Sequence, residues 1–320
     1  MTTENRRFDL IAVFPGQGSQ SIGMLADLAQ TFPRVQATFA DASDVLGYDL
    51  WDLVQNGDKT KLNQTEYTQP AMLVAGVAVW NVWRSLNGVM PIAMAGHSLG
   101  EYTALVCAGA LPFEQAVALV AERAHCMQQA VPEGVGAMAA ILGLDDDKVR
   151  QVCADMAQDE VVEAVNFNAP GQVVIAGNTA AVERAMIAMK EAGAKRALPL
   201  PVSVPSHCAL MQEAAQRFSD AVNKVDMVQP MVPIIQNVDA AQHTSPDEIR
   251  ALLIEQLYKP VRWVDTIQSM ANNGVNKLIE AGPGKVLTGL NKRIDKAMLA
   301  MPVLDSASLN QALEKLGEQA

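Results

Sequence analysis

Residues 96–100 read Gly-His-Ser-Leu-Gly, and this pentapeptide constrains the fold more than any other part of the chain. The apolar run Pro91–Ala95 before it predicts a buried strand, and Glu101–Ala108 after it predicts a helix. A strand, a Gly-x-Ser-x-Gly turn and a helix are the setting of a nucleophile elbow, a turn so sharp that a Cβ at the glycine positions would clash. The pattern predicts that Ser98 is lifted clear of a sheet and faces the N-terminal amides of the helix. The alternative is a glycine-rich turn with an idle serine.

The composition argues against some classes of binding partner. The 320 residues carry a net charge of −11 and only 5% aromatic residues, which argues against a nucleic-acid-binding surface. The longest apolar runs, such as Ala71–Trp80, are too short to cross a bilayer, and residues 1–7 make a poor signal peptide. We therefore expect a cytoplasmic protein without a membrane or nucleic-acid partner.

The sequence shows no pattern typical of a metal site or a resident cofactor. Its four cysteines are widely spread and have no metal-ligand spacing, so we expect free buried thiols in a reducing compartment and no zinc site. The loop Pro15–Gln20 contains two glycines, but Ser21 stands where a dinucleotide-binding fingerprint has its third glycine. The cysteines are Cys107, Cys126, Cys153 and Cys208.

The middle of the chain has a pattern of its own. Between residues 131 and 203, turn residues and apolar periodicity predict the order strand, helix, strand, strand, helix, strand of a ferredoxin-like unit. The predicted elements are Gly136–Leu142, Asp145–Gln158, Val161–Asn166, Gln172–Ala176, Thr179–Ala192 and Arg196–Val202. Further strands and helices are predicted on both sides of this stretch, ending in a helical region after Gly284. This order indicates a small domain inserted into a larger α/β body.

A serine hydroxyl is a weak nucleophile until a base takes its proton, and histidine is the usual base. Among the four histidines, His97 should point away from the neighbouring Ser98, His243 lies in a polar run, and His125 falls on the polar side of its predicted helix. His207 remains, at the seam between the small domain and the body. It is the candidate base, and a hydrogen-bonded loop histidine is the alternative.

Arg123 lies on the apolar side of the predicted helix Phe113–Gln129, between Val120 and Met127. An unpaired buried cation is rare, because desolvation costs several kcal/mol. One interpretation is an internal salt bridge or a side chain that reaches water. The other is an arginine in a cleft whose planar guanidinium binds a substrate carboxylate. The helical periodicity leaves both open.

Several motifs together resemble one family, the malonyl-CoA:acyl-carrier-protein transacylases of bacterial type II fatty-acid synthesis. They occur in the family's order, cover nearly the whole chain and show no departure at a functional position. The matching segments are Phe14–Gln20, Gly96–Glu101, Ala121–Arg123, Pro205–His207, Gln256 with Pro260–Trp263, and Glu280–Gly284. The resemblance implies an α/β-hydrolase-like body with a parallel sheet, residues 1–130 and 204–320, and an inserted ferredoxin-like subdomain, residues 131–203.

The resemblance also implies roles for single residues. Ser98 is expected to be the nucleophile and His207 the general base. The backbone carbonyl of Gln256 is expected to orient His207, so that no triad acid is needed. The other implied roles are the oxyanion hole, formed by the amides of Gln17 and Leu99, and the binding of the malonyl carboxylate by Arg123.

The implied reaction is a ping-pong transfer. Ser98 attacks the malonyl thioester, CoA leaves, and the phosphopantetheine thiol of acyl carrier protein takes the malonyl group from the ester, with His207 serving both halves. The implied partners are malonyl-CoA and acyl carrier protein; we expect no permanently bound cofactor, no metal and a monomer. A polyketide acyltransferase would share these motifs, and a serine esterase or thioesterase would share the elbow. A non-catalytic carrier-binding scaffold would not need Ser98, His207 and Arg123 together.

The charge of the chain bears on its docking with a carrier. Acyl carrier proteins are acidic as a class, and this chain is acidic too, so docking needs a local basic patch. The candidates are Lys195 with Arg196, and Lys292 with Arg293. For each pair the alternative is an ordinary solvated charge.

Overall fold

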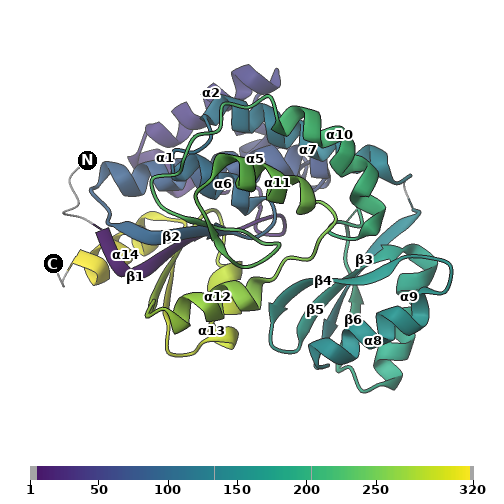
Figure 1. Cartoon of the computed structure of the whole chain (residues 1–320). Coiled ribbons are helices and arrows are strands. Elements are labelled where there is room, and N and C mark those ends of the chain that lie inside the picture. The colour runs from purple at the N-terminus through teal and green to yellow at the C-terminus, as the bar shows by residue number, and fades with distance from the viewer. Residues whose placement is uncertain (1–5, 133, 203, 318–320) are drawn as a thin grey trace.

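The computed structural model describes residues 6–132, 134–202 and 204–317. Residues 1–5, the beginning of the segment that makes a poor signal peptide, lie outside the described residues. A large sheet has helices on both faces, and a smaller sheet with two helices lies beside it (Figure 1). Within the described ranges, no helix is both long and apolar enough to cross a membrane.

The large sheet has the strand order β10-β9-β1-β2-β7-β8. Its pairs are parallel except for β7 with β8 at one edge. The strands are β1 (Arg6–Phe14), β2 (Met90–Gly96), β7 (Ile234–Ile235), β8 (Gln242–His243), β9 (Lys277–Ala281) and β10 (Leu299–Val303). Because parallel strands need crossover connections, helices cover this sheet on both sides.

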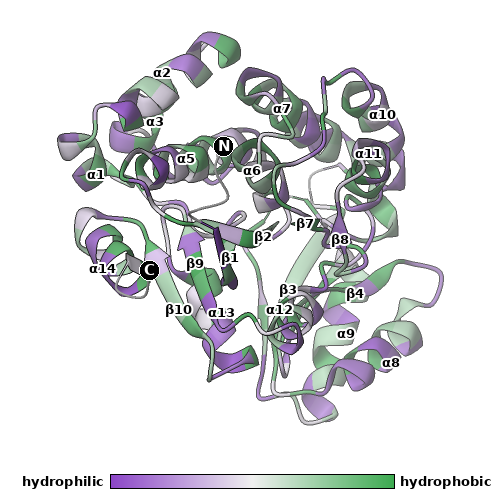
Figure 2. Ribbon diagram, turned by 60° about the vertical axis from the view of Figure 1, so that its left-hand side comes forward, coloured by the Kyte–Doolittle hydropathy of each residue, from purple (hydrophilic) through white to green (hydrophobic). Residues whose placement is uncertain are grey.

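The helices of the body fall into two groups. On the N-terminal side they are α1 (Ala26–Thr31), α2 (Arg34–Leu46), α3 (Leu50–Asn56), α4 (Lys59–Leu62), α5 (Thr65–Ser85), α6 (Gly100–Cys107) and α7 (Phe113–Ala130). After the small sheet come the 3-10 turn η2 (Ala209–Met211), α10 (Gln212–Val222), α11 (Pro246–Glu255), α12 (Trp263–Asn272), α13 (Val286–Ile294) and α14 (Ser306–Gly317). In Figure 2, surface helices such as α14 carry both hydrophobic and hydrophilic residues, as expected of helices that cover a core with one side.

Side chains of the central strand β1 alternate between two cores. Leu10, Ala12 and Phe14 pack with residues of α5, α6 and α7. Ile11 and Val13 pack instead with residues of α12 and α13. Successive side chains of a strand point to opposite faces, so this unbroken apolar run fits a strand that is buried on both sides.

The small sheet has the order β4-β5-β3-β6 with antiparallel pairs. Its elements in chain order are β3 (Gly136–Leu142), α8 (Asp146–Ala157), β4 (Val162–Ala169), β5 (Gln172–Asn178), α9 (Thr179–Glu191) and β6 (Arg196–Pro199). Ile141, Val173 and Ile175 face α8 and α9. The predicted ferredoxin-like unit beside an α/β body is therefore confirmed. The limits 131 and 203 stay a prediction; residues 133 and 203 lie outside the described part.

The seam between the two sheets runs along β4. The Val261 N–H donates to the Val165 carbonyl at 2.8 Å, and the Phe167 N–H donates to the Val261 carbonyl at 3.0 Å. His97 Nε2, one residue after β2, lies 2.7 Å from Asn168 Oδ1 of β4. The small sheet is thus attached to the body directly beside residues 96–100.

The cysteines lie inside this structure. All four are free and buried, as predicted. In the part of the chain described here, no group of three or more His, Cys, Asp or Glu side chains is arranged to hold a metal ion.

Candidate active site

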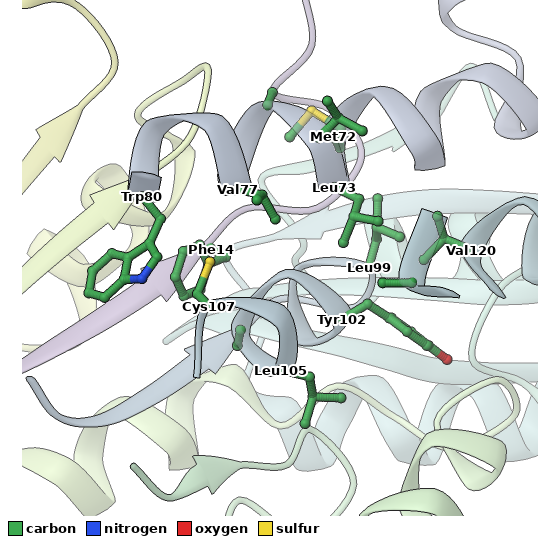
Figure 3. Close-up of a cluster of buried hydrophobic side chains, with 14 of the residues drawn as sticks. Phe14, Met72, Leu73, Val77, Trp80, Leu99, Tyr102, Leu105, Cys107 and Val120 are labelled. Atoms are coloured by element: carbon green, nitrogen blue, oxygen red, sulfur yellow. The ribbon is translucent and has the colours of Figure 1, made fainter. Parts of the chain in front are cut away.

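Ser98 lies at the tip of a sharp turn between β2 and α6. Its φ is +51°, in the left-handed region that side-chain-bearing residues rarely adopt. A Cβ at Gly96 would lie 1.8 Å from the Gly100 carbonyl carbon, and one at Gly100 would lie 2.0 Å from the Phe14 oxygen. Only glycine fits either position. Figure 3 shows Leu99 among buried hydrophobic side chains that include Leu73 of α5, so the residue after the serine anchors the turn in the core. Ser98 itself is half-buried.

His207 contacts the serine hydroxyl. Its Nε2 lies 2.8 Å from Ser98 Oγ, and its Nδ1 lies 2.6 Å from the backbone oxygen of Gln256. A carbonyl oxygen only accepts hydrogen bonds, so Nδ1 carries the proton and Nε2 is the acceptor for the Ser98 hydroxyl. Burial, and then the positive charge of Arg123, lower the pKa of His207 to about 3, so the imidazole is neutral at pH 7.

Arg123 is fully buried next to this pair. Its Nη2 lies 3.4 Å from Ser98 Oγ and donates to Gln256 Oε1 at 2.9 Å, while Nη1 donates to Gln69 Oε1 at 2.8 Å. Within the described residues Arg123 makes no ion pair. Burial raises the pKa of the nearby Glu101 to about 8, and the charge of Arg123 offsets this rise only in part. The internal salt bridge considered from the sequence is therefore wrong.

Gln256 links the three groups. Besides the backbone contact to His207 and the side-chain contact to Arg123, its Nε2 donates to the Ser98 carbonyl at 3.0 Å. The C=O and N–H of one trans peptide point in opposite directions. Holding the Ser98 carbonyl thus also sets the direction of the Leu99 N–H.

The loop after β1 lies against the same turn. A Cβ added to Gly16 would lie 2.5 Å from the His97 oxygen and 3.7 Å from the Leu99 nitrogen. The backbone just before Gln17 therefore passes close to the turn. The Ser98 N–H, by contrast, donates to Asn237 Oδ1 at 2.7 Å and is already occupied. The side chain of Gln17 contacts Thr65 Oγ1 at 3.3 Å.

Known proteins similar to this chain point to one family. A family model described as an acyl transferase domain matches residues 11–307. Malonyl CoA-acyl carrier protein transacylase of Escherichia coli (strain K12) is 56% identical over 302 residues, which are 94% of this chain and 98% of that protein. The chain belongs to this transacylase family.

Solved structures of the family have the same fold. An acyl carrier protein S-malonyltransferase from Vibrio cholerae superposes with a TM-score of 0.93 at 58% identity, covering 95% of this chain and 99% of that chain. A malonyl-transacylase in complex with its type II PKS acyl-carrier protein superposes with a TM-score of 0.95 at 56% identity, covering 96% and 99%. The same transacylase name is carried by a Bacillus subtilis relative that is 42% identical over 96% of this chain and 97% of its own length.

The other predicted residues occupy separate places in this transacylase fold. His97 turns away from Ser98 toward Asn168, as expected. His125 is exposed and bonded to Gln129. His243 lies in the short strand β8 and contacts Asp239 and Glu248, which raise its pKa and outweigh the opposing effect of burial. None of these three contacts the Ser98 hydroxyl.

The four basic residues expected to dock a carrier are exposed. Arg196 is the first residue of β6, and Lys195 directly precedes it with its side chain close to Gly143. Lys292 and Arg293 lie in the last turn of α13, and Arg293 donates to the Pro170 carbonyl and to Gln172 at the turn between β4 and β5. Both pairs therefore border the small sheet.

Two residues at the site were missed by sequence analysis. Gln69 supports the Arg123 guanidinium from α5, and Asn237 contacts the turn at Ser98. Each is a polar residue within a largely apolar stretch and is buried in the structure. That is a weak signal, because nothing in the sequence says which partner such an amide has.

Proposed function

We propose that this chain transfers the malonyl group of malonyl-CoA to the phosphopantetheine thiol of acyl carrier protein through a malonyl ester on Ser98. The observation that carries the proposal is a fully buried guanidinium that has no ion pair among the described residues and lies 3.4 Å from a serine hydroxyl bonded to His207. A serine and a histidine suit acyl transfer in general. The arginine restricts the acyl group to one that carries a negative charge, as malonyl does.

In the first half-reaction, His207 Nε2 takes the proton of Ser98 as Oγ bonds to the thioester carbonyl carbon. The carbonyl oxygen becomes an oxyanion, which the N–H groups of Gln17 and Leu99 stabilise. When the C–S bond breaks, His207 returns the proton to the CoA sulfur. The products are free CoA and a malonyl ester on Ser98.

In the second half-reaction the same atoms work in reverse. The phosphopantetheine thiol gives its proton to His207, and its sulfur attacks the ester carbonyl carbon. The bond between that carbon and Ser98 Oγ breaks, and the serine oxygen takes the proton back. The two thioesters are chemically alike, so one site serves both halves.

The choice of a backbone carbonyl to orient His207 follows from the neighbouring charge. A carboxylate at the position of the Gln256 oxygen would attract Arg123 and compete with the substrate for it. A carbonyl fixes the same imidazole tautomer without a full charge. The Arg123 guanidinium then remains free to bind the malonyl carboxylate.

The test is intact mass spectrometry. After mixing with malonyl-CoA, the protein is expected to gain one malonyl group, located on Ser98 by peptide mapping, and to lose it when phosphopantetheinylated carrier is added. An adduct that disappears at the same rate without carrier would indicate a hydrolase. Absence of any adduct would contradict the proposed function.

The physiological carrier is the finer part of the proposal. One structural neighbour is in complex with a type II PKS acyl-carrier protein, so a polyketide carrier is the second candidate for this chain. Transfer rates from malonylated protein to a fatty-acid carrier and to a polyketide carrier, measured side by side, distinguish the two. We expect the fatty-acid carrier to be the faster acceptor.

Arg123→Ala is expected to change acyl preference. Without the guanidinium the malonyl carboxylate is buried unpaired, which costs about 3 kcal/mol, or about 100-fold in malonyl transfer. Acetyl transfer lacks this interaction and should change far less. Both are measured as kcat/KM, with Arg217→Ala on α10, an exposed arginine, as the control. An equal loss for both acyl groups would assign Arg123 a structural role.

Lys195→Glu combined with Arg196→Glu is expected to weaken transfer to the carrier about 10-fold at low salt and to flatten its salt dependence, because rim charges act mainly on encounter. Acylation by malonyl-CoA should change less than two-fold. The control is Arg217→Glu with Lys224→Glu, which makes the same charge change at exposed positions of α10 and its end. Equal effects on both half-reactions, or none, would exclude this pair and leave Lys292 with Arg293.

A further inference from the structure

Asn237 is a buried amide that follows the short strand β7, with 1% of its surface exposed. Each of its polar groups has a partner. The backbone N–H donates to Glu101 Oε2 at 2.8 Å, and the backbone carbonyl accepts from the Arg262 N–H at 3.0 Å. The side chain accepts from the Ser98 N–H and donates to the Gly96 carbonyl, both at 2.7 Å.

The side chain of Asn237 therefore bridges the two sides of the turn that carries the nucleophile. Gly96 is the last residue of β2, and Ser98 stands at the tip with a φ of +51°. Such a conformation persists only where the surrounding structure enforces it. We propose that Asn237 is a positioning residue that holds Ser98 in this conformation and thereby aims its hydroxyl at His207. This inference rests on the proposed acyl transfer through Ser98.

Glu101 and Arg262 hold Asn237 itself in place. Glu101 lies in the first turn of α6, directly after the turn that Asn237 bridges, so its carboxyl fixes Asn237 relative to that turn. Arg262 follows Val261, which is bonded to β4 at the seam. Asn237 is thus fixed from the helix on one side and from the seam on the other.

The bridge needs an amide. One end must accept from an N–H and the other must donate to a carbonyl. Aspartate has the same shape but presents only an acceptor to the Gly96 carbonyl when ionised, and leucine has neither function. The occupied Ser98 N–H also explains why oxyanion stabilisation falls to the amides of Leu99 and Gln17.

The test compares Asn237→Leu with Gln236→Leu. Both replace a buried amide of one short segment by leucine, but the Gln236 side chain has no hydrogen-bond partner among the described residues. For Asn237→Leu we expect single-turnover acylation by malonyl-CoA to slow about 100-fold, as is typical of a misplaced nucleophile, with KM changed less than three-fold. Gln236→Leu should stay within three-fold of wild type. Melting temperatures of both variants establish that they are folded at the assay temperature.

A second readout does not depend on malonyl binding. Phenylmethylsulfonyl fluoride sulfonylates an activated serine oxygen with loss of fluoride, and Asn237→Leu should slow this labelling of Ser98 to the same extent. If the wild-type protein is labelled but not malonylated, the proposed function is wrong. The labelling rates of the Asn237 and Gln236 variants still test the role of Asn237 in that case. If the leucine variant does not fold, Asn237→Asp, which keeps the size of asparagine, takes its place. Its rate of Ser98 labelling should be at least 10-fold lower than that of wild type. Labelling within three-fold of wild type in a folded Asn237 variant, or equal losses in Gln236→Leu, overturns the inference.

Discussion

Ser98→Ala is expected to abolish covalent malonylation and to reduce transfer to the carrier to the background of the uncatalysed exchange. The substitution removes the atom that forms the ester, and no other hydroxyl among the described residues lies within hydrogen-bond distance of His207 Nε2. Without the nucleophile of a serine–histidine pair, only substrate binding and oxyanion stabilisation remain, and no acyl-enzyme can form. Intact mass after incubation with malonyl-CoA measures the loss directly.

The fold of this variant should be close to that of wild type. Ser98 is half-buried, and alanine has the same Cβ, so the strained backbone at φ +51° is retained. Ser219→Ala, which removes a hydroxyl from α10, serves as the control and should malonylate at the wild-type rate. Malonylated Ser98→Ala protein would show that another residue is the nucleophile.

The arrangement around residues 96–100 was predictable because it follows from local sterics. The spacing of Gly96 and Gly100 requires two close backbone approaches, where an added Cβ would lie 1.8 and 2.0 Å from neighbouring backbone atoms. The flanking apolar runs specify a strand and a helix. The ferredoxin-like unit was predictable for a similar reason. Its six elements follow one another with short turns, and that order determines the sheet β4-β5-β3-β6.

Other parts depend on contacts between distant segments, and the sequence does not specify these. Asn237 bonds to Ser98 and Gly96, which lie 139 and 141 positions before it in the chain. Gln69 likewise lies 54 positions before Arg123. Strand β10 stands where the sequence predicts only a helical region, because its five residues contain Pro302 and are held by parallel pairing with β9. Whether Arg123 forms an ion pair also required the structure, since its partners Gln69 and Gln256 lie 54 and 133 positions away in the chain.

His207→Ala is expected to slow both half-reactions by about 1,000-fold, while Ser98 remains present. Without the imidazole the hydroxyl has no acceptor for its proton, and the leaving CoA sulfur has no donor. Stopped-flow acylation with malonyl-CoA and single-turnover transfer to the carrier measure the two halves separately. His125→Ala is the matched control, because His125 is exposed on the outer side of α7 and should be nearly silent. The reverse ranking of the two histidine variants would exclude His207 as the base.

The pH dependence tests whether His207 stays neutral in the folded protein. Burial and Arg123 lower the pKa of His207 to about 3, so the folded protein keeps this imidazole neutral where an ordinary histidine is protonated. In wild type, kcat/KM for acylation should therefore stay level from about pH 8 to about pH 5 instead of falling below the usual histidine pKa of about 6.5. Stability follows the same sign: below about pH 6.5 the unfolded chain binds a proton that the folded chain excludes, so the free energy of unfolding falls as pH decreases toward the folded pKa. His207→Ala should lose less stability than wild type over that window. An acid limb near pH 6.5 in wild type, or identical acid sensitivity in the variant, would show that His207 does not titrate as the structure indicates.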